Sequence, residues 1–515
     1  MPRNDAARLW AYLEKRFYLC YNEGCRKSRI LKGVACRPSV HTNDKQNLIE
    51  KERGVRALTQ QNGTIAAIAT PPGVGGIAVV RISGEGAYGV AEAVFRPKNP
   101  RKSLRAAQGY TALFGHFVED GVLCDEVVAL CFRAPHSYTG EDVVALSCHG
   151  GSAVSARLLR ACYAAGATPA GPGEFTKRAF LSGRISLTQA EAVMDLINAT
   201  SRQGAAAAAA AMEGALYAKI RSVQEGLVAL AGHLAAYTDY PEEDVPELSM
   251  DTLGASLSDA KKVLDRLVAG YDTGAVLRRG VETAIIGSPN VGKSTLLNLL
   301  SGFERAIVTP VAGTTRDVVE QEIQLAGVRL LLADTAGIRD TDDVVEAEGI
   351  RRSYRHLERA SLILAVFDGS APLSPADLAL AEKCVDRPAV AILNKTDLPQ
   401  RADAEILRPY FGTVVNISAK DSAFLPAVEQ AVSDALHLAE VDPDAGLLAN
   451  ERQLAAARAA QNALADALDA VNSGYTLDAA GVCVDDALRA LYDLTGENAT
   501  DDVIDEVFSK FCVGK

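Results

Sequence analysis

Residues 287–294 carry the side chains best suited to chemistry. They read Gly-Ser-Pro-Asn-Val-Gly-Lys-Ser, follow an apolar run that ends at Ile286, and open a helical segment over 295–300. Glycines let backbone N–H groups curl around an anion, and a helix N-terminus adds positive potential. This spacing is typical of a phosphate-binding loop between a strand and a helix. We therefore expect Lys293 to reach the β- and γ-phosphates and the Ser294 hydroxyl to coordinate Mg²⁺.

Two motifs further along the chain are suited to hold the metal ion and to respond to the γ-phosphate. Residues 313–317 read Gly-Thr-Thr-Arg-Asp, in which Thr315 would give Mg²⁺ a second hydroxyl ligand. An apolar run over 330–333 then precedes Asp-Thr-Ala-Gly at 334–337. Asp334 would hold the metal through water, and the Gly337 amide would face the γ-phosphate.

The last two motifs select the base. An apolar strand pattern over 389–393 is followed by Asn-Lys-Thr-Asp at 394–397, and Ser-Ala-Lys follows at 418–420. The Asp397 carboxylate can accept hydrogen bonds from N1–H and the 2-amino group of guanine. Adenine has neither donor and would leave a buried carboxylate unpaired, which discriminates strongly against it. Five motifs in this order and spacing predict a guanine-nucleotide site.

The whole chain is too long for one hydrophobic core. Its 515 residues favour three or four domains, and 48% hydrophobic with 23% charged residues is ordinary for a globular protein. No apolar stretch reaches the roughly 18 uncharged residues that a membrane span needs. Ten cysteines at irregular spacing suggest neither a zinc site nor a disulfide framework. A reducing, cytoplasmic compartment fits this composition.

The charge is distributed unevenly. Residues 1–62 hold 13 Lys/Arg and 6 Asp/Glu, a balance of +7, so the remainder carries −12 − 7 = −19. An acidic body argues against broad electrostatic capture of nucleic acid, and an RNA partner would need a local basic patch. Two basic groups are candidates for such a patch or are ordinary surface charge: Lys177, Arg178 and Arg184, and Arg351, Arg352, Arg355 and Arg359.

Residues 1–62 differ in composition and in hydrophobic pattern from the rest of the chain. Ala6, Leu9, Trp10, Leu13 and Phe17 would line one face of a short helix. This pattern leaves open a mitochondrial targeting segment, although its acidic residues count against one. We expect instead a disordered extension or a start codon placed too far upstream.

The remaining chain predicts four segments. Residues 63–182 read as one α+β domain, with strands over 64–69, 77–82, 127–132 and 143–147 and a helix over 152–165. Residues 183–278 and 440–515 read as helical, and 279–439 alternate strand and helix, which indicates a mainly parallel sheet. The GTPase domain is therefore expected as an insertion between two helical segments that pack together.

Sequence marks outside the GTPase motifs resemble the MnmE (TrmE) family of tRNA-modification GTPases over nearly all of residues 63–515. The marks are Ala-Thr-Pro-Pro-Gly at 69–73 with Arg-Ile-Ser-Gly at 81–84, Tyr-Thr-Gly-Glu-Asp at 138–142, Pro-Gly-Glu-Phe-Thr-Lys-Arg-Ala-Phe-Leu at 172–181, and the terminal Phe-Cys-Val-Gly-Lys. Residues 1–62 lie outside the resemblance.

The resemblance implies an N-terminal folate-binding, dimerising domain, a split helical domain and an inserted Ras-like GTPase domain. Members of the family act with the flavoprotein MnmG (GidA) in a heterotetramer. They place an aminomethyl or carboxymethylaminomethyl group on C5 of the tRNA wobble uridine, and a 5,10-methylene or 5-formyl tetrahydrofolate supplies the carbon. By motif match the folate site would use Arg81, Glu141, Arg184 and Lys515. Cys512 matches the family's near-terminal cysteine and is either a functional thiol or a small buried hydrophobe.

The resemblance also bears on hydrolysis, because Ile338 occupies the position of the water-orienting Gln of Ras-like proteins. In the family a K⁺ ion beside the phosphates supplies the charge of an arginine finger, and a switch glutamate orients the water indirectly. The matching positions here are Asn290, Thr309, Val311 and Thr314 for K⁺ and Glu346 for the glutamate. Lys293, Asn290 and Glu346 are thus the predicted catalytic residues. The predicted nucleotide contacts are Asn290, Val291, Gly292, Lys293, Ser294, Thr295, Thr309, Pro310, Val311, Ala312, Gly313, Thr314, Thr315, Asp334, Thr335, Ala336, Gly337, Asn394, Lys395, Thr396, Asp397, Ser418, Ala419 and Lys420.

Two other functions compete with this interpretation. A regulatory GTPase of the ribosome-assembly kind would have much the same nucleotide motifs but would not explain the terminal Phe-Cys-Val-Gly-Lys. A free-standing folate-dependent one-carbon transferase would need no flavoprotein partner. The sequence leaves open which tRNAs are used and whether glycine or ammonia gives the nitrogen.

Overall fold

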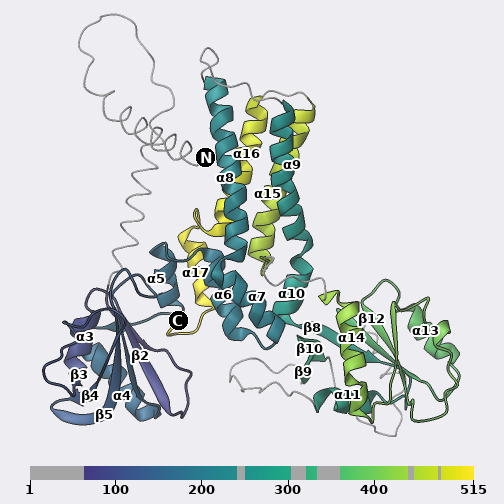
Figure 1. Ribbon diagram of the computed structural model, residues 1–515, viewed down its shortest axis with the longest axis horizontal. Coiled ribbons are helices and arrows are strands. Elements are labelled where there is room, and N and C mark those ends of the chain that lie inside the picture. The colour runs from purple at the N-terminus through teal and green to yellow at the C-terminus, as the bar shows by residue number, and fades with distance from the viewer. Residues whose placement is uncertain (1–62, 240–249, 303–320, 333–359, 439–445, 474–476) are drawn as a thin grey trace, which may run out of the picture. The chain divides into compact units, whose positions relative to one another are not determined.

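The computed structural model describes residues 63–239, 250–302, 321–332, 360–438, 446–473 and 477–515 (Figure 1). Residues 63–515 form one compact unit, and every structural statement below concerns its described residues. The interpretations of residues 1–62 therefore lie outside the described residues. None of the described helices is long and apolar enough to cross a membrane.

The N-terminal part of this unit is built on a seven-stranded sheet in the order β3-β4-β5-β6-β2-β1-β7. Neighbouring strands are antiparallel except for the parallel pair β1 and β7. Helices α3 (Ala87–Val94) and α4 (Ser152–Ala164) pack against it around buried residues such as Val80, Phe117 and Leu146. The strands are β1 Ile65–Ile68, β2 Ile77–Ser83, β3 Phe95–Pro97, β4 Thr111–Glu119, β5 Val122–Phe132, β6 Val143–His149 and β7 Thr168–Pro169.

The expected strands and helix of this part are present, but the sequence pattern missed the helix α3 and the strands β3, β4 and β7. In β4 the alternation of buried and exposed residues passes through Gly115, which weakens a strand pattern. A Cβ at Gly115 would lie 2.3 Å from the Arg96 carbonyl oxygen and 2.6 Å from the Phe95 ring. The close approach of β3 therefore requires glycine where the pattern favours a side chain.

The helical segments on either side of the GTPase region share one core, as expected. Leu264 from the first segment and Leu464 and Leu491 from the second are fully buried in it. Arg452 also pairs with Glu191 at 2.8 Å across the two segments. The helices are α5 Glu174–Leu181, α6 Leu187–Asn198, α7 Arg202–Glu213, α8 Ala215–Asp239, α9 Met250–Ala269 and α10 Tyr271–Arg279, then α15 Glu451–Asn472, α16 Leu477–Thr495 and α17 Asp501–Ser509.

The region between these segments contains a second sheet, in the order β13-β12-β11-β8-β10-β9 among the described strands. All neighbours are parallel except β9 and β10, as the strand–helix alternation predicts. The strands are β8 Val281–Ile286, β9 Gln321–Leu325, β10 Val328–Leu332, β11 Leu362–Asp368, β12 Ala389–Asn394 and β13 Thr413–Asn416, and the helices are α11 Lys293–Ser301, α13 Pro375–Glu382 and α14 Leu425–Ala435. Parallel strands end at one edge, where such sheets bind ligands.

The β9–β10 hairpin contacts the helical part of the chain. Its turn residue Gly327 accepts a hydrogen bond from the Gln203 backbone N–H at 3.4 Å, at the start of α7. The side chain of Gln324 donates to the Thr200 carbonyl. Nearby, Arg278 of α10 pairs with Asp195 at 3.1 Å. Burial raises the pKa of Asp195, and the charge of Arg278 opposes that shift.

Candidate nucleotide site and the C-terminal junction

The predicted phosphate loop joins β8 to α11 and passes close to two other strand ends. A Cβ at Gly287 would lie 2.3 Å from the Val366 carbonyl oxygen, and one at Gly292 would lie 2.2 Å from the Asn394 side-chain nitrogen. Both glycines also have positive φ angles, 155° and 101°. Asn290 adopts the left-handed region with φ 61°, which asparagine tolerates better than most residues. The loop thus needs its glycines for conformation and for space.

Lys293 and Ser294 begin the helix that follows this loop. The Lys293 Nζ donates to the carbonyls of Gly287 and Ser288 at 2.9 and 2.8 Å, so the ammonium group lies back over the loop. Ser294 and Thr295 lie in the first turn of α11, where backbone N–H groups lack helical acceptors. The arrangement offers an ammonium, N–H donors and a hydroxyl to a phosphate–metal group.

A buried amide connects the phosphate loop to the predicted base-binding segment. Asn394, only 3% exposed, donates from Nδ2 to the Val291 carbonyl at 2.8 Å. Its Oδ1 accepts from the Ala419 backbone N–H at 2.9 Å. Both ends of this amide therefore bind protein. We infer that Asn394 acts by positioning the two loops.

Two neighbouring side chains hold the carboxylate of Asp397. Ser418 Oγ donates to Oδ1 at 2.9 Å and Lys420 Nζ to Oδ2 at 3.0 Å. The hydrogen bond from Lys420, then that from Ser418, holds the pKa of Asp397 below its ordinary value. Each carboxylate oxygen keeps a free lone pair for a further hydrogen bond.

Two supporting carboxylates were missed by the sequence analysis. Asp368, at the end of β11, pairs with Lys395 at 2.7 Å. Burial raises the pKa of Asp368, but hydrogen bonds from Lys395 and Ser370 outweigh it and hold the pKa below its ordinary value. Asp377 accepts from Ser288 Oγ at 2.6 Å and so ties the phosphate loop to α13. Neither carboxylate belongs to a nucleotide motif. In the sequence, only the position of Asp368 at the end of an apolar strand could have indicated that it lies near the site.

Several predicted nucleotide and metal residues lie outside the described residues: Thr309, Pro310, Val311, Ala312, Gly313, Thr314, Thr315, Asp334, Thr335, Ala336, Gly337 and Glu346. The second basic group, Arg351, Arg352, Arg355 and Arg359, lies outside them as well.

The second predicted site lies where the C-terminal tail meets the N-terminal domain. Val513 forms a β-bridge with Pro172, and the Lys515 carbonyl accepts from the Phe175 N–H at 3.1 Å. The exposed Cys512 accepts through its carbonyl from the Gly173 N–H at 3.3 Å. A Cβ at Gly514 would lie 2.4 Å from the Ile68 carbonyl oxygen, so only glycine fits there.

Cations and aromatic rings meet at this junction. The Arg81 guanidinium donates to the Gly514 carbonyl at 3.3 Å and lies 5.5 Å from the centre of the Phe175 ring. Arg81 and Arg184 lie 6.0 and 5.8 Å from the centre of the Tyr138 ring. Burial lowers the pKa of Lys515, and the charge of Arg81 lowers it further.

None of the three cations forms an ion pair with any described residue, which suits this junction to an anion. Glu141, by contrast, accepts from Ser83 at 2.7 Å and pairs with Arg178 at 3.0 Å.

Two members of the first basic group are paired with acidic side chains. Arg178 contacts both Glu141 and Glu174, and Lys177 pairs with Asp505 at 2.5 Å. These two residues are therefore ordinary paired charges and make a poor RNA surface.

Comparison with known proteins decides the family. The family models "GTP-binding protein TrmE N-terminus" and "MnmE helical domain" match residues 64–184 and 187–512. The tRNA modification GTPase MnmE of Heliobacterium modesticaldum is 42% identical over 466 residues, which cover 88% of this chain and 99% of that protein. The chain belongs to the MnmE family. The MnmE of Lactococcus lactis subsp. cremoris strain MG1363 is likewise 42% identical, over 89% of this chain and 100% of that protein.

Membership of the MnmE family confirms the predicted multidomain fold class and identifies the chain as a GTPase. The two family models also match the N-terminal and helical parts, outside the nucleotide motifs. These matches count against a regulatory GTPase of the ribosome-assembly kind, which the nucleotide motifs alone would have allowed. A solved structure of Aquifex aeolicus Era bound to GDP and AlF4⁻ is similar at 29% identity over 36% of this chain and 66% of that chain, with a TM-score of 0.23.

The predicted contact between Asp397 and guanine can be tested by substitution. An amide at position 397 would present an N–H donor to the guanine donors, so Asp397→Asn should weaken GTP binding on the order of 10²-fold or more. Xanthosine triphosphate carries a carbonyl in place of the 2-amino group and should gain affinity. Titration of both nucleotides with Asp397→Asn and with the exposed control Asp403→Asn measures this. Equal losses for the two nucleotides would show that Asp397 is structural.

Proposed function

We propose that the chain hydrolyses GTP and, with an MnmG-type flavoprotein, places an aminomethyl or carboxymethylaminomethyl group on C5 of the tRNA wobble uridine. A one-carbon tetrahydrofolate would supply the carbon. The matched relatives are named tRNA modification GTPases, which supports the tRNA substrate. We retain the predicted domains 63–182, 183–278, 279–439 and 440–515 as part of this proposal.

The observation that carries the proposal is the docking of the C-terminal tail. The helical part that brackets the GTPase region continues through α17 into this tail. The tail ends against Phe175 and Arg81 of the N-terminal domain. A change in conformation at the nucleotide site would thus pass through the helical part and the tail. It would reach the proposed anion site at the C-terminal junction.

The junction suits a reduced folate. Arg81, Arg184 and Lys515 would attract its glutamate carboxylates, and the rings of Tyr138 and Phe175 offer surfaces for its flat pteridine. Glu141 is held near by Ser83 and would accept from pterin N–H groups. Cys512, exposed on the same tail, is the thiol available next to this site.

The described residues also fit the metal ions of the proposal. The Ser294 hydroxyl, on the first turn of α11, is a hard oxygen donor of the kind Mg²⁺ prefers, and Thr315 would complete the pair. For K⁺ we propose Asn290 with Thr309, Val311 and Thr314. The side chain of Asn290 makes no hydrogen bond to another described residue, so its amide oxygen is available. K⁺ would supply positive charge beside the phosphates.

The proposed assembly is a homodimer that joins the flavoprotein in a heterotetramer, without a membrane, in the cytoplasm. The hairpin between β4 and β5 exposes the consecutive residues Val122 and Leu123 at its end, at 59% and 60%. Apolar side chains at the end of a hairpin offer a surface for a second copy. A mitochondrial location would depend on residues 1–62.

Nucleoside analysis tests the proposal directly. Cells that lack the gene should lose the C5-modified wobble uridine, and the chain should restore it together with its flavoprotein partner. An unchanged nucleoside profile would show that the chain acts elsewhere.

GTP turnover should depend on K⁺. We expect faster hydrolysis in KCl than in NaCl at equal ionic strength, because the proposed site around Asn290 would take K⁺ and place its charge beside the phosphates. Asn290→Ala should lose this difference and still bind GTP, whereas Asn298→Ala, on the exposed face of α11, should keep it. Equal rates of the unmodified protein in the two salts would contradict the K⁺ site.

Glu346→Ala should lower turnover on the order of 10²-fold, the range of a lost positioning or acid–base group, with GTP affinity unchanged. The control Glu348→Ala should turn over normally. If hydrolysis drives modification, the Glu346→Ala strain should still dimerise and bind folate but leave wobble uridines unmodified. Wild-type levels of the modified nucleoside in that strain would show that modification does not require GTP hydrolysis.

Folate affinity should depend on pH through Lys515. Its pKa is lowered from 10.5, so the ammonium charge is present at low pH and is lost at a lower pH than for an exposed lysine. Binding of 5-formyltetrahydrofolate should weaken as the pH rises through that range. Lys515→Arg should remove the decline because arginine stays charged, and Lys510→Arg should retain it. A decline in Lys515→Arg would assign it to another group.

A further inference from the structure

One surface of the N-terminal domain is basic although the chain is acidic overall. Residues 95–118 contain five Lys/Arg and no Asp/Glu, in a chain of net charge −12. The basic residues are concentrated in the loop that joins β3 to β4. They are Arg96, Lys98, Arg101, Lys102 and Arg105.

The loop is held in one conformation by the domain beneath it. Leu104 is inserted into the core and is 1% exposed. Arg133 donates to the carbonyls of Arg105 and Ala107 at 2.7 and 3.4 Å, and is itself paired with Asp142 at 2.9 Å. These contacts anchor the backbone of the loop around residues 104–107, so less backbone entropy is lost when the loop binds a ligand.

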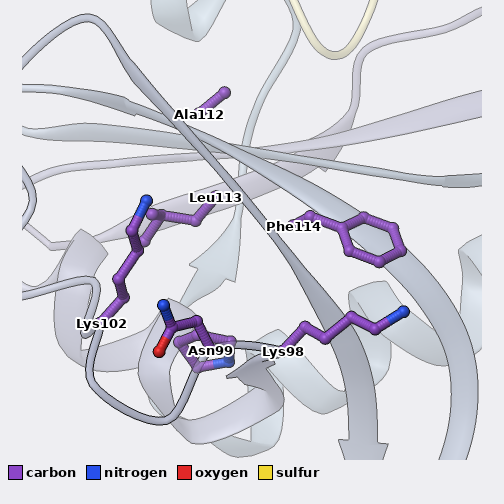
Figure 2. A pocket seen from close by; sticks show the side chains of 7 residues that line it. Lys98, Asn99, Lys102, Ala112, Leu113 and Phe114 are labelled. Carbon is purple, nitrogen blue, oxygen red and sulfur yellow. The ribbon is translucent and has the colours of Figure 1, made fainter.

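Two of these cations flank a cavity of about 310 Å³. Figure 2 shows the ammonium groups of Lys98 and Lys102 on either side of Asn99, with Phe114 above Lys98. The Lys98 ammonium lies 5.1 Å from the centre of the Phe114 ring. Lys98, Arg101 and Lys102 form no ion pair with a described residue. Their charge is thus available to a ligand.

Exposed aromatic rings accompany this charge. Tyr110, at the end of the loop, is 74% exposed and is held edge-on against Phe132 at 5.8 Å between ring centres. Phe114 is 45% exposed beside the cavity. Fixed rings next to cations can stack on bases while the cations bind phosphates.

We propose that this basic surface, formed by Lys98, Arg101, Lys102, Tyr110 and Phe114, binds the sugar–phosphate backbone and unstacked bases of RNA. The inference rests on the proposed function, whose substrate is a tRNA. The unpaired cations continue beyond the cavity to Arg101, whereas Arg105 pairs with Glu92 at 2.8 Å. Cations spread along the loop beside two exposed rings match the repeated phosphates and bases of a nucleic acid. An acidic protein partner is the alternative that the test below separates.

The test replaces three unpaired cations. The full-length variant Lys98→Gln/Arg101→Gln/Lys102→Gln should bind unmodified tRNA at least about tenfold more weakly near 0.1 M salt. Each phosphate contact adds about 0.7–0.9 to the slope of log affinity against log salt, so the slope should fall by about 2. The matched control Lys262→Gln/Arg408→Gln/Lys510→Gln removes the same charge from surface ion pairs elsewhere and should bind as wild type does. GTP hydrolysis should be unchanged in both.

Four outcomes would overturn the inference, three of them seen by comparing the variants. These are tRNA binding by the first variant equal to wild type, equal losses in variant and control, and loss of flavoprotein binding with tRNA binding intact. The last would show an acidic protein partner. Failure of wild type to bind tRNA would also overturn it. The nucleoside analysis is independent of these measurements, so the proposed function can stand if the surface does not bind RNA.

Discussion

The nucleotide site depends on one buried amide, that of Asn394. It holds the Val291 carbonyl on one side and the Ala419 N–H on the other, and so fixes the distance between the phosphate loop and the base loop. The same side chain leaves no room for a Cβ at Gly292. A buried polar group without its partner costs about 1–3 kcal/mol. The spacing of two motifs more than 100 residues apart along the sequence therefore rests on a packing requirement.

The C-terminal junction shows a comparable dependence on glycine. Gly514 lies against the Ile68 carbonyl, and Gly173 lies against the Phe511 side chain. These contacts leave space for Arg81 to reach the tail. Each site is thus assembled by segments from distant parts of the chain, and the shared helical core connects them.

Much of this arrangement could be predicted from the sequence. Among the described residues, the phosphate loop and the segments 394–397 and 418–420 follow strand ends as expected, because short glycine-rich loops and apolar strands have strong local signals. The sequence analysis did not single out the basic loop of the N-terminal domain, whose anchoring depends on the burial of Leu104 and the contacts of Arg133. Asp377 and Asn394 bind the phosphate loop through contacts between segments far apart in the sequence. A local sequence pattern cannot predict such contacts. The pairing of Lys177 and Arg178 with acidic residues likewise depends on the fold.

The contact between the β9–β10 hairpin and α7 has a mechanical consequence. The hairpin is the stretch of chain between 303–320, which carries Thr315, and 333–359, which carries Asp334. Five residue pairs join its strands, and its tip, at Gly327, accepts a hydrogen bond from the Gln203 N–H. If Thr315 and Asp334 bind the nucleotide as proposed, the hairpin links both of these residues to the first turn of α7. A change at either end of the hairpin would then reach the helical core through this contact.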